Sequence, residues 1–167
     1  MENLFLLLAS GFTLRIPKKK FKRYLLGAPG CSTYLVTGNT TVHFKHTKDG
    51  DRVYFYDQCV DGVTFGFISV QMKEVYTLQQ AENILVQYIN RVRKPFHIAV
   101  NIAKEIEKKE HQVTINDYWQ DEMGTDWKIK GYTNGKTIAV LYVKNISDSL
   151  VDEQDTFLNG FKFSRFS

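Results

Sequence analysis

The sequence has few of the residues that build disulfide scaffolds, metal centres and rigid linkers. Its 167 residues contain two cysteines, three prolines and four histidines. No CxxC or Cys/His spacing typical of a metal site is present. Cys31 and Cys59 could pair as one disulfide or stay as two separate thiols, and the sequence leaves both open. These scarcities exclude a disulfide-stapled mini-protein, and we expect neither a bound metal nor a cofactor.

Long apolar runs are also absent. The apolar stretch at residues 4–9 is shorter than the roughly 7–15 residues of a signal-peptide core, and Glu2 gives its flank the wrong charge. It is far shorter than the ~20 residues of a membrane-spanning helix, so we expect no transmembrane segment and interpret the stretch as a strand. The compartment stays open: cytoplasmic if the chain is complete, periplasmic or lumenal if an export signal is missing.

Motifs of the common enzyme classes are missing. We find no GxSxG, HExxH, GxGxxG, phosphate-binding loop or kinase signature. The acidic stretch DYWQDEMGTD, residues 117–126, could hold a hard cation through carboxylate oxygens, but its spacing fits no EF-hand. We interpret it as a solvated hairpin loop. We lean towards a protein without catalytic residues, although missing motifs do not exclude an enzyme.

Aromatic residues, in contrast, are abundant. Phenylalanine, tyrosine and tryptophan make up 14% of the chain, a composition that favours strands over helices. Hydrophobic residues reach 43%, and a chain of this length buries about 70% of its unfolded surface, which is enough for a core without staples. There is no internal repeat and no linker, so we expect residues 1–167 to form one domain.

One segment has the clear pattern of an amphipathic helix. Residues 78–93 repeat apolar side chains at spacings of three and four, which places them on one stripe. Thr77 precedes the stripe as a helix cap, Gln80 completes a capping box, and Pro95 ends the helix. A second, short helix is expected from about Asp152. Residues 96–106 fit either an alternating strand or a helix, and we prefer the strand.

The first of two glycine-containing turns predicts a hairpin. Residues 43–56 alternate around Asp49-Gly50, a strong two-residue turn signal. Such a turn would place apolar residues on one face and a cationic-aromatic set on the other. The predicted pairs are Phe44 with Phe55 and His46 with Val53 on the first face, and Lys45 with Tyr54 and His43 with Tyr56 on the second.

A second turn, at Asn134-Gly135, predicts another hairpin. Its predicted pairs are Ile129 with Val140 and Trp127 with Tyr142. The strand after this turn, residues 137–143, is apolar on both faces, which is typical of a sheet covered on both sides. Further strands are expected at 63–72, 111–119 and 161–164. Two tight hairpins indicate a largely antiparallel sheet, so the sequence predicts an α+β fold with helices packed on that sheet.

The order of elements in the C-terminal half is known from one family. A strand with a tryptophan (DWKIKGYTNG) is followed by a hairpin into an apolar strand (KTIAVLYVKN), a short acidic helix and a closing FLNGFKF. GFTLRIP near the start and the strand-to-helix passage FGFISVQMKEVYTLQQAENIL complete a pattern that resembles PsbP-like proteins. This family includes the lumenal subunit of photosystem II, a nuclear Ran-binding protein and bacterial envelope proteins. The resemblance implies an αβα sandwich and a non-enzymatic accessory role, and we expect a bacterial origin.

The segment PKKKFKR, residues 17–23, concentrates five positive charges. It lies between a predicted strand at 11–16 and the turn cluster GAPG at 27–30, so we place it in a loop with Phe21 turned inward. It could be a solvated edge, an anion-binding patch or a nuclear address. We prefer the solvated edge, because the rest of the chain dilutes its charge to a net +4. The residues of the candidate patch are Lys18, Lys19, Lys20, Lys22, Arg23, Lys45, Tyr54 and Tyr56.

These observations favour an accessory or partner-binding module whose partner is a protein. One alternative is a nucleic-acid or anionic-surface binder that uses residues 18–23. The other is a small-ligand binder or enzyme with a pocket between helix and sheet near Trp119 and Trp127. The sequence leaves the oligomeric state open.

Overall fold

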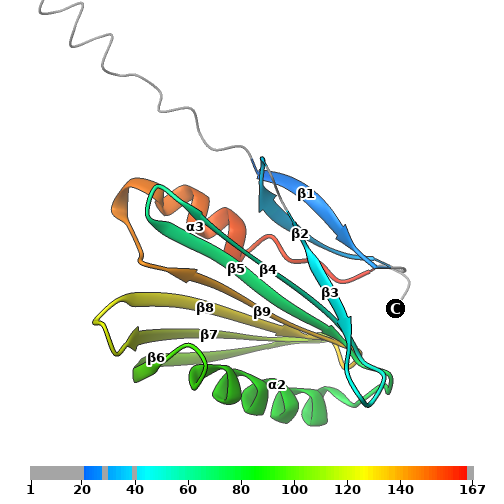
Figure 1. Ribbon diagram of the computed structural model, residues 1–167. Coiled ribbons are helices and arrows are strands. Elements are labelled where there is room, and N and C mark those ends of the chain that lie inside the picture. The colour runs from blue at the N-terminus through cyan, green and yellow to red at the C-terminus, as the bar shows by residue number, and fades with distance from the viewer. Residues whose placement is uncertain (1–20, 28–29, 39–40, 165–167) are drawn as a thin grey trace, which may run out of the picture.

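The core of the fold is a seven-stranded sheet in which every neighbouring pair of strands is antiparallel (Figure 1). The computed structural model describes residues 21–27, 30–38 and 41–164. The strand order is β3-β4-β5-β9-β8-β7-β6. In chain order, the strands are β3 (His43–His46), β4 (Arg52–Val60), β5 (Val63–Gln71), β6 (Ile98–Lys109), β7 (Gln112–Asp121), β8 (Asp126–Thr133) and β9 (Thr137–Lys144).

The predicted long helix is α2 (Leu78–Arg93). The hydroxyl of Thr77 accepts the backbone N–H of Gln80 at 3.3 Å, and the Gln80 side chain accepts the N–H of Thr77 at 3.1 Å. The predicted capping box is therefore confirmed. The second predicted helix is α3 (Val151–Leu158), which follows a short 3-10 turn, η1 (Asp148–Leu150).

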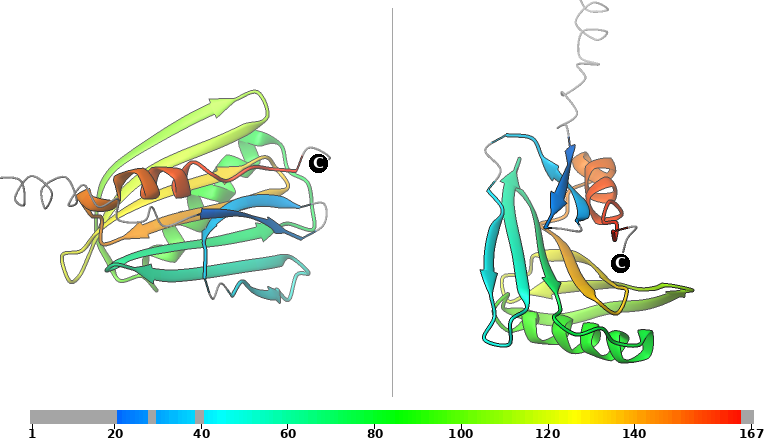
Figure 2. Two further views of the ribbon diagram at one scale, coloured as in Figure 1. Left: turned by 90° about the horizontal axis from the view of Figure 1, so that it is seen from above. Right: turned by 90° about the vertical axis from the view of Figure 1, so that its right-hand side faces the viewer.

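Two layers cover opposite faces of the sheet (Figure 2). α2 packs on one face, against β7, β8 and β9. The other face carries α3 and a separate hairpin of β1 (Phe21–Leu26) and β2 (Cys31–Val36). β9 lies under both layers, so Val140 and Leu141 are fully buried although they point to opposite faces. The predicted α+β sandwich and its doubly covered strand are confirmed.

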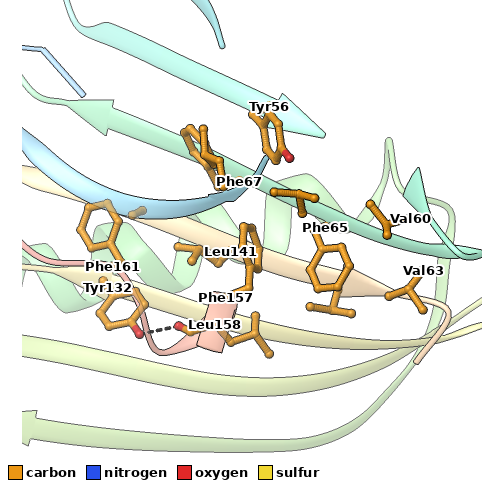
Figure 3. Close-up of a cluster of buried hydrophobic side chains, with 14 of the residues drawn as sticks. Tyr56, Val60, Val63, Phe65, Phe67, Tyr132, Leu141, Phe157, Leu158 and Phe161 are labelled. Atoms are coloured by element: carbon orange, nitrogen blue, oxygen red, sulfur yellow. Dashed lines mark hydrogen bonds between the residues drawn. The ribbon is translucent and has the colours of Figure 1, made fainter. Parts of the chain in front are cut away.

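Aromatic side chains form much of the core on the α3 side (Figure 3). Phe65 and Phe157 meet edge to face, with their ring centroids 5.4 Å apart. Phe21 packs against both rings from β1, so it turns inward as expected. The hydroxyl of Tyr132 donates a hydrogen bond to the carbonyl of Leu158 at 2.6 Å. This bond fixes α3 over β8.

The first predicted hairpin forms, but its register differs by one residue. The observed pairs are His43 with Phe55, Phe44 with Tyr54, Lys45 with Val53 and His46 with Arg52. The turn has three residues instead of two, because the N–H of Thr47 donates to the carbonyl of Asp51 at 2.9 Å. Gly50, with φ of +89°, takes the left-handed position of this longer loop. The predicted faces are therefore wrong, since a shift of one residue exchanges them.

The second predicted hairpin is shifted by two residues. The observed pairs include Ile129 with Tyr142 and Trp127 with Lys144. The turn is centred on Gly135 and Lys136, where the N–H of Asn134 donates to the carbonyl of Thr137 at 3.4 Å. Because side chains alternate with a period of two, this shift changes the partners and preserves the faces.

The remaining expectations have mixed outcomes. Residues 96–106 contain a strand, as preferred, but β6 runs on to Lys109 and most of its side chains are exposed. No strand forms at 161–164, where Lys162 makes only an isolated bridge to Ser32. Cys31 and Cys59 are both free. The strands expected at 1–9 and 11–16 lie outside the described residues. Among the helices that the structure describes, none has the length and apolar character to cross a membrane.

Candidate binding groove

α2 leaves part of its face of the sheet uncovered. Seven strands spaced by about 4.8 Å form a surface roughly 30 Å wide, whereas one helix covers about 10 Å. α2 lies closest to β8 at Gly131, where a methyl group would lie 2.8 Å from Cδ1 of Ile89. Glycine at this position therefore allows the helix to approach the sheet. As a result, the same face of β4 and β5 is only partly covered: Val53 and Val70 are buried, whereas Phe55 and Ile68 are not.

A groove of about 660 Å³ occupies this uncovered area. α2 forms one wall, with Ile84, Tyr88 and Arg91, and the β3–β4 hairpin forms the other. The apolar residues contributed by the strands and their ends include Val53, Phe55, Ile68, Val70, Met72 and Ile138. The volume and the mainly apolar lining are typical of a site for a small ligand.

Strand register places three residues in a row across one end of the groove. Asp57, Gly66 and Tyr142 are neighbours on β4, β5 and β9. A side chain at position 66 would overlap the Tyr142 ring, so the glycine allows this ring to lie across β5 towards Asp57. Tyr142 is only 8% exposed, yet its hydroxyl makes no hydrogen bond to any residue that the structure describes. Burial, with a smaller contribution from the charge of Asp57, raises the pKa of Tyr142, so the phenol keeps its proton.

Further aromatic rings lie around this end of the groove. Phe96, in the connection from α2 to β6, has its ring centroid 5.0 Å from those of both Tyr142 and Trp127. Tyr88 on α2 and Phe55 on β4 also line the groove. Burial raises the pKa of Tyr88. Both tyrosines are therefore neutral hydrogen-bonding groups at ordinary pH.

Charged side chains flank the apolar middle of the groove. Asp57 and Arg91 lie on opposite walls near Tyr142, and neither forms an ion pair with a described residue. Lys45 and Asp51 line the end next to the hairpin turn. The carboxylate of Asp51 is already occupied, because it accepts the backbone N–H of Lys73 at 2.9 Å. The charges without a partner near Tyr142 are thus one carboxylate and one guanidinium group.

The two tryptophans predicted for a pocket do not line the groove. Trp119 is fully buried and Trp127 is 4% exposed, because both belong to the core under α2. A groove does lie between α2 and the sheet, but beside this core and not at the two tryptophans. The sequence signal for it was Gly66 in VTFGFISVQM, since a glycine inside a strand indicates the close approach of another group.

The described part of the basic segment belongs to β1 rather than to a loop. Residues 18–20 lie outside the described residues. Lys22 is exposed, whereas Arg23 is bound internally. Its Nη1 atom donates to the hydroxyl of Ser32 at 2.8 Å and to the carbonyl of Gly160 at 3.1 Å. Arg23 therefore connects the β1–β2 hairpin to the segment after α3.

The other residues of the candidate patch lie on two different faces. Lys45 lines the groove, while the rings of Tyr54 and Tyr56 pack in the core on the α3 side of β4, although Tyr56 also borders the groove. Tyr56 is 3% exposed, and its hydroxyl donates to the Gln58 side chain at 2.8 Å. Burial raises the pKa of Tyr56 to about 12. The structure thus does not bring Lys45 together with these two tyrosines, because the hairpin register differs from the predicted one.

The acidic stretch 117–126 forms the end of the β7–β8 hairpin. One carboxylate oxygen of Asp121 accepts the N–H groups of Met123 and Thr125, and the other accepts the indole N–H of Trp127 at 3.0 Å. Burial alone would raise the pKa of Asp121, but these hydrogen bonds and the charge of Lys144 hold it below its ordinary value. The described residues contain no group of three or more His, Cys, Asp or Glu side chains placed to hold a metal ion.

Comparison with solved structures identifies the architecture. The solution structure of cyanobacterial PsbP (CyanoP) from Synechocystis sp. PCC 6803 matches 89% of this chain and 95% of its own, with a TM-score of 0.56 and 14% sequence identity. The chain has a PsbP-like fold. No family model and no curated protein sequence matches it. Because a PsbP-like fold does not itself define a role, the function has to be argued from the groove.

Proposed function

We propose that this protein is a non-enzymatic accessory module that binds a partner molecule in the groove between α2 and strands β3 to β5. One observation carries the proposal: the α2-side face of β4 and β5 is apolar, yet Phe55 and Ile68 on this face stay partly exposed in the groove. Exposed apolar patches with a polar rim mark interaction sites on soluble domains. An apolar sheet face that served only folding would be covered by α2.

The chemistry of the lining supports binding rather than catalysis. No histidine, cysteine or serine is among the described residues that line the groove. Nucleophilic catalysis needs a nucleophile within hydrogen-bonding reach of a base, and Asp57 has no such neighbour. Apolar contacts and unpaired polar groups are what a site needs to hold and orient a molecule.

A photo-crosslinking residue in place of Phe55 tests this proposal. The chain, with benzoylphenylalanine at position 55, is produced in the cells from which it comes and is irradiated there. Tyr118 provides a matched control, because it is 39% exposed against 37% for Phe55 and lies on the opposite face of the sheet. We expect an adduct of one defined mass at position 55 and none at position 118. An unmodified protein, or the same adducts at both positions, would show that the groove is not the binding surface.

A further inference from the structure

The groups around Tyr142 indicate which class of molecule the groove would hold. We propose that its ligand is a small organic cation: an apolar chain or ring that ends in an amine or a quaternary ammonium group. This inference rests on the proposed function, since it assigns a chemistry to the same groove. The head group would lie between Asp57 and Tyr142, and the apolar body would extend towards Phe55 and Ile68.

The first support is the pair of polar groups without a partner. The ring of Tyr142 is buried, but its hydroxyl is open to the groove and forms no hydrogen bond to a described residue. Asp57 follows in the same row of the sheet, one strand beyond Gly66, and its exposed carboxylate forms no ion pair or hydrogen bond with a described residue. The Tyr142 ring fills the space above Gly66, so an ammonium group at the groove side of the phenol could donate to the Asp57 carboxylate and to the phenol oxygen. A bound donor would thus satisfy both groups.

The second support is the number of aromatic rings. The described lining contains Phe55, Phe96, Tyr88 and Tyr142. The face of an aromatic ring attracts a cation, and sites for quaternary ammonium groups are built from such rings. The protein already uses this attraction in the groove, where Nζ of Lys45 lies 5.6 Å from the centre of the Phe55 ring. The body of the ligand would lie against the same ring.

Arg91 distinguishes a cationic ligand from an anionic one. It lines the groove from α2, but it forms no ion pair with Asp57. An anionic ligand would use Arg91 as its main contact, whereas a cationic ligand would be repelled by it. Both charged side chains are exposed, but strand register places Asp57 in the same row as Tyr142, whereas Arg91 lies on the helix wall. The charge that the sheet places next to the phenol is therefore the negative one, and it favours a cation.

Three soluble probes that share one ring test the inference. Benzyltrimethylammonium, phenylacetate and 2-phenylethanol are titrated separately into isotope-labelled protein, and the methyl signals of Ile68 and Ile84 are followed by NMR. We expect saturable shifts with the cation at concentrations about tenfold lower than with the other two probes. Asp57→Asn should weaken binding of the cation about fivefold to tenfold, as expected for the loss of one charge contact near a protein surface. Asp148→Asn, in η1 and outside the groove, is the matched control and should leave the affinity within twofold.

Arg91→Gln should change the binding affinity in opposite directions for the cationic and the anionic probe. It should tighten binding of benzyltrimethylammonium and weaken binding of phenylacetate, because it removes a positive charge from the groove. Tighter binding of phenylacetate than of the cation in the unmodified protein would overturn the inference and retain the groove as a binding site. An unchanged affinity for the cation in Asp57→Asn would also overturn it. If none of the probes shifts the groove signals, both the inference and the proposed function fail.

Discussion

Two areas of the sheet are only partly covered by the helices and the β1–β2 hairpin, and the chemistry of their side chains differs. On the α2 side, β4 and β5 present apolar residues such as Phe55 and Ile68 to the groove. On the other face, the hairpin and α3 cover the middle of the sheet, and β6 and β7 present Glu105, Asn116 and Tyr118 (Figure 2). The β6–β7 area mixes polar side chains with single exposed apolar ones such as Val100, whereas the apolar side chains of the groove are contiguous. Lack of cover alone therefore does not indicate a binding site, whereas a continuous apolar lining does.

The outer strand β6 supports this distinction. It is an edge strand, and its exposed second half carries the charged sequence KEIEKK. Its pairing with β7 is interrupted at two places, between Ile98 and Val100 and between Asn101 and Ala103. Charges and bulges are the usual means by which an edge strand avoids pairing with other chains. The second half of β6 is thus a charged edge, although Val100, Ile102 and Ile106 are also exposed along this strand.

The largest difference is expected between two charge substitutions on α2. One places a charge on the side that is buried against the sheet, and the other places it on the side that lines the groove. Ile89 is fully buried against the sheet, whereas Ile84 is half-buried and lines the groove. Ile89→Asp should prevent cooperative folding, because a core does not tolerate an unpaired charge. Ile84→Asp should give a folded protein. Circular dichroism during urea unfolding measures both, and loss of folding in Ile84→Asp would show that the groove is closed.

A smaller loss of stability is expected in the strand that lies under both layers. Leu141 on β9 is fully buried on the α3 side. Leu141→Ala should lower the free energy of unfolding by about 2–5 kcal/mol, as truncations in a packed core do. Phe55→Ala, in the uncovered area, should cost clearly less because its side chain is already 37% exposed. Equal losses in the two variants, measured by urea unfolding, would remove the contrast between covered and uncovered strands.

The end of the groove is sensitive to a single methyl group. Gly66→Ala should destabilise the protein by about 1–3 kcal/mol, because the new Cβ overlaps the Tyr142 ring and forces it to move. Combining Gly66→Ala with Tyr142→Ala should cost less than the sum of the two single losses, since the overlap is then gone. A double-mutant cycle in urea measures this coupling. Simple additivity would mean that the Tyr142 ring does not lie over β5.

Local patterns in the sequence were enough to predict the elements and most of their faces. The capping box at Thr77 and the apolar strand 137–143 were read correctly because neighbours along the chain determine them. The hairpin registers were harder, since the number of residues in a turn depends on its backbone geometry. At Gly50 the predicted register differs from the observed one by one residue, so residues predicted to share a face of the hairpin lie on opposite faces. At Gly135 the difference is two residues, so the partners change but the faces are predicted correctly.

The groove could not be predicted in the same way. Asp57, Gly66 and Tyr142 form one row only because β4, β5 and β9 are neighbours, and strand order is a property of the whole fold. Trp119 and Trp127 are conspicuous in the sequence, and the pattern predicts a pocket near them. Their size makes them good core residues, and the structure uses them as such.

The smallest changes in stability are expected in the basic segment, where the neighbouring side chains of Lys22 and Arg23 have different environments. Arg23 is hydrogen-bonded internally, and its guanidinium group lies 4.1 Å from the centre of the Tyr34 ring. Arg23→Gln should destabilise the protein by about 1 kcal/mol, because it leaves these partners without a charged donor. Lys22→Gln removes the same charge from an exposed site and should cost less than about 0.5 kcal/mol. Equal costs, measured by urea unfolding, would mean that Arg23 does not connect the hairpin to the segment after α3.

The same segment also tests whether a charged surface, rather than the groove, binds the partner. Replacement of Lys19, Lys20 and Lys22 by Gln should leave retention on heparin weak before and after the change, if these residues form a solvated edge. A polyanion-binding surface would instead show a steep salt dependence. Each phosphate contact removed would lower the slope of log K against log salt by about 0.7–0.9. Micromolar binding of single-stranded RNA at physiological salt that the triple variant loses would move the binding surface from the apolar groove to the basic segment.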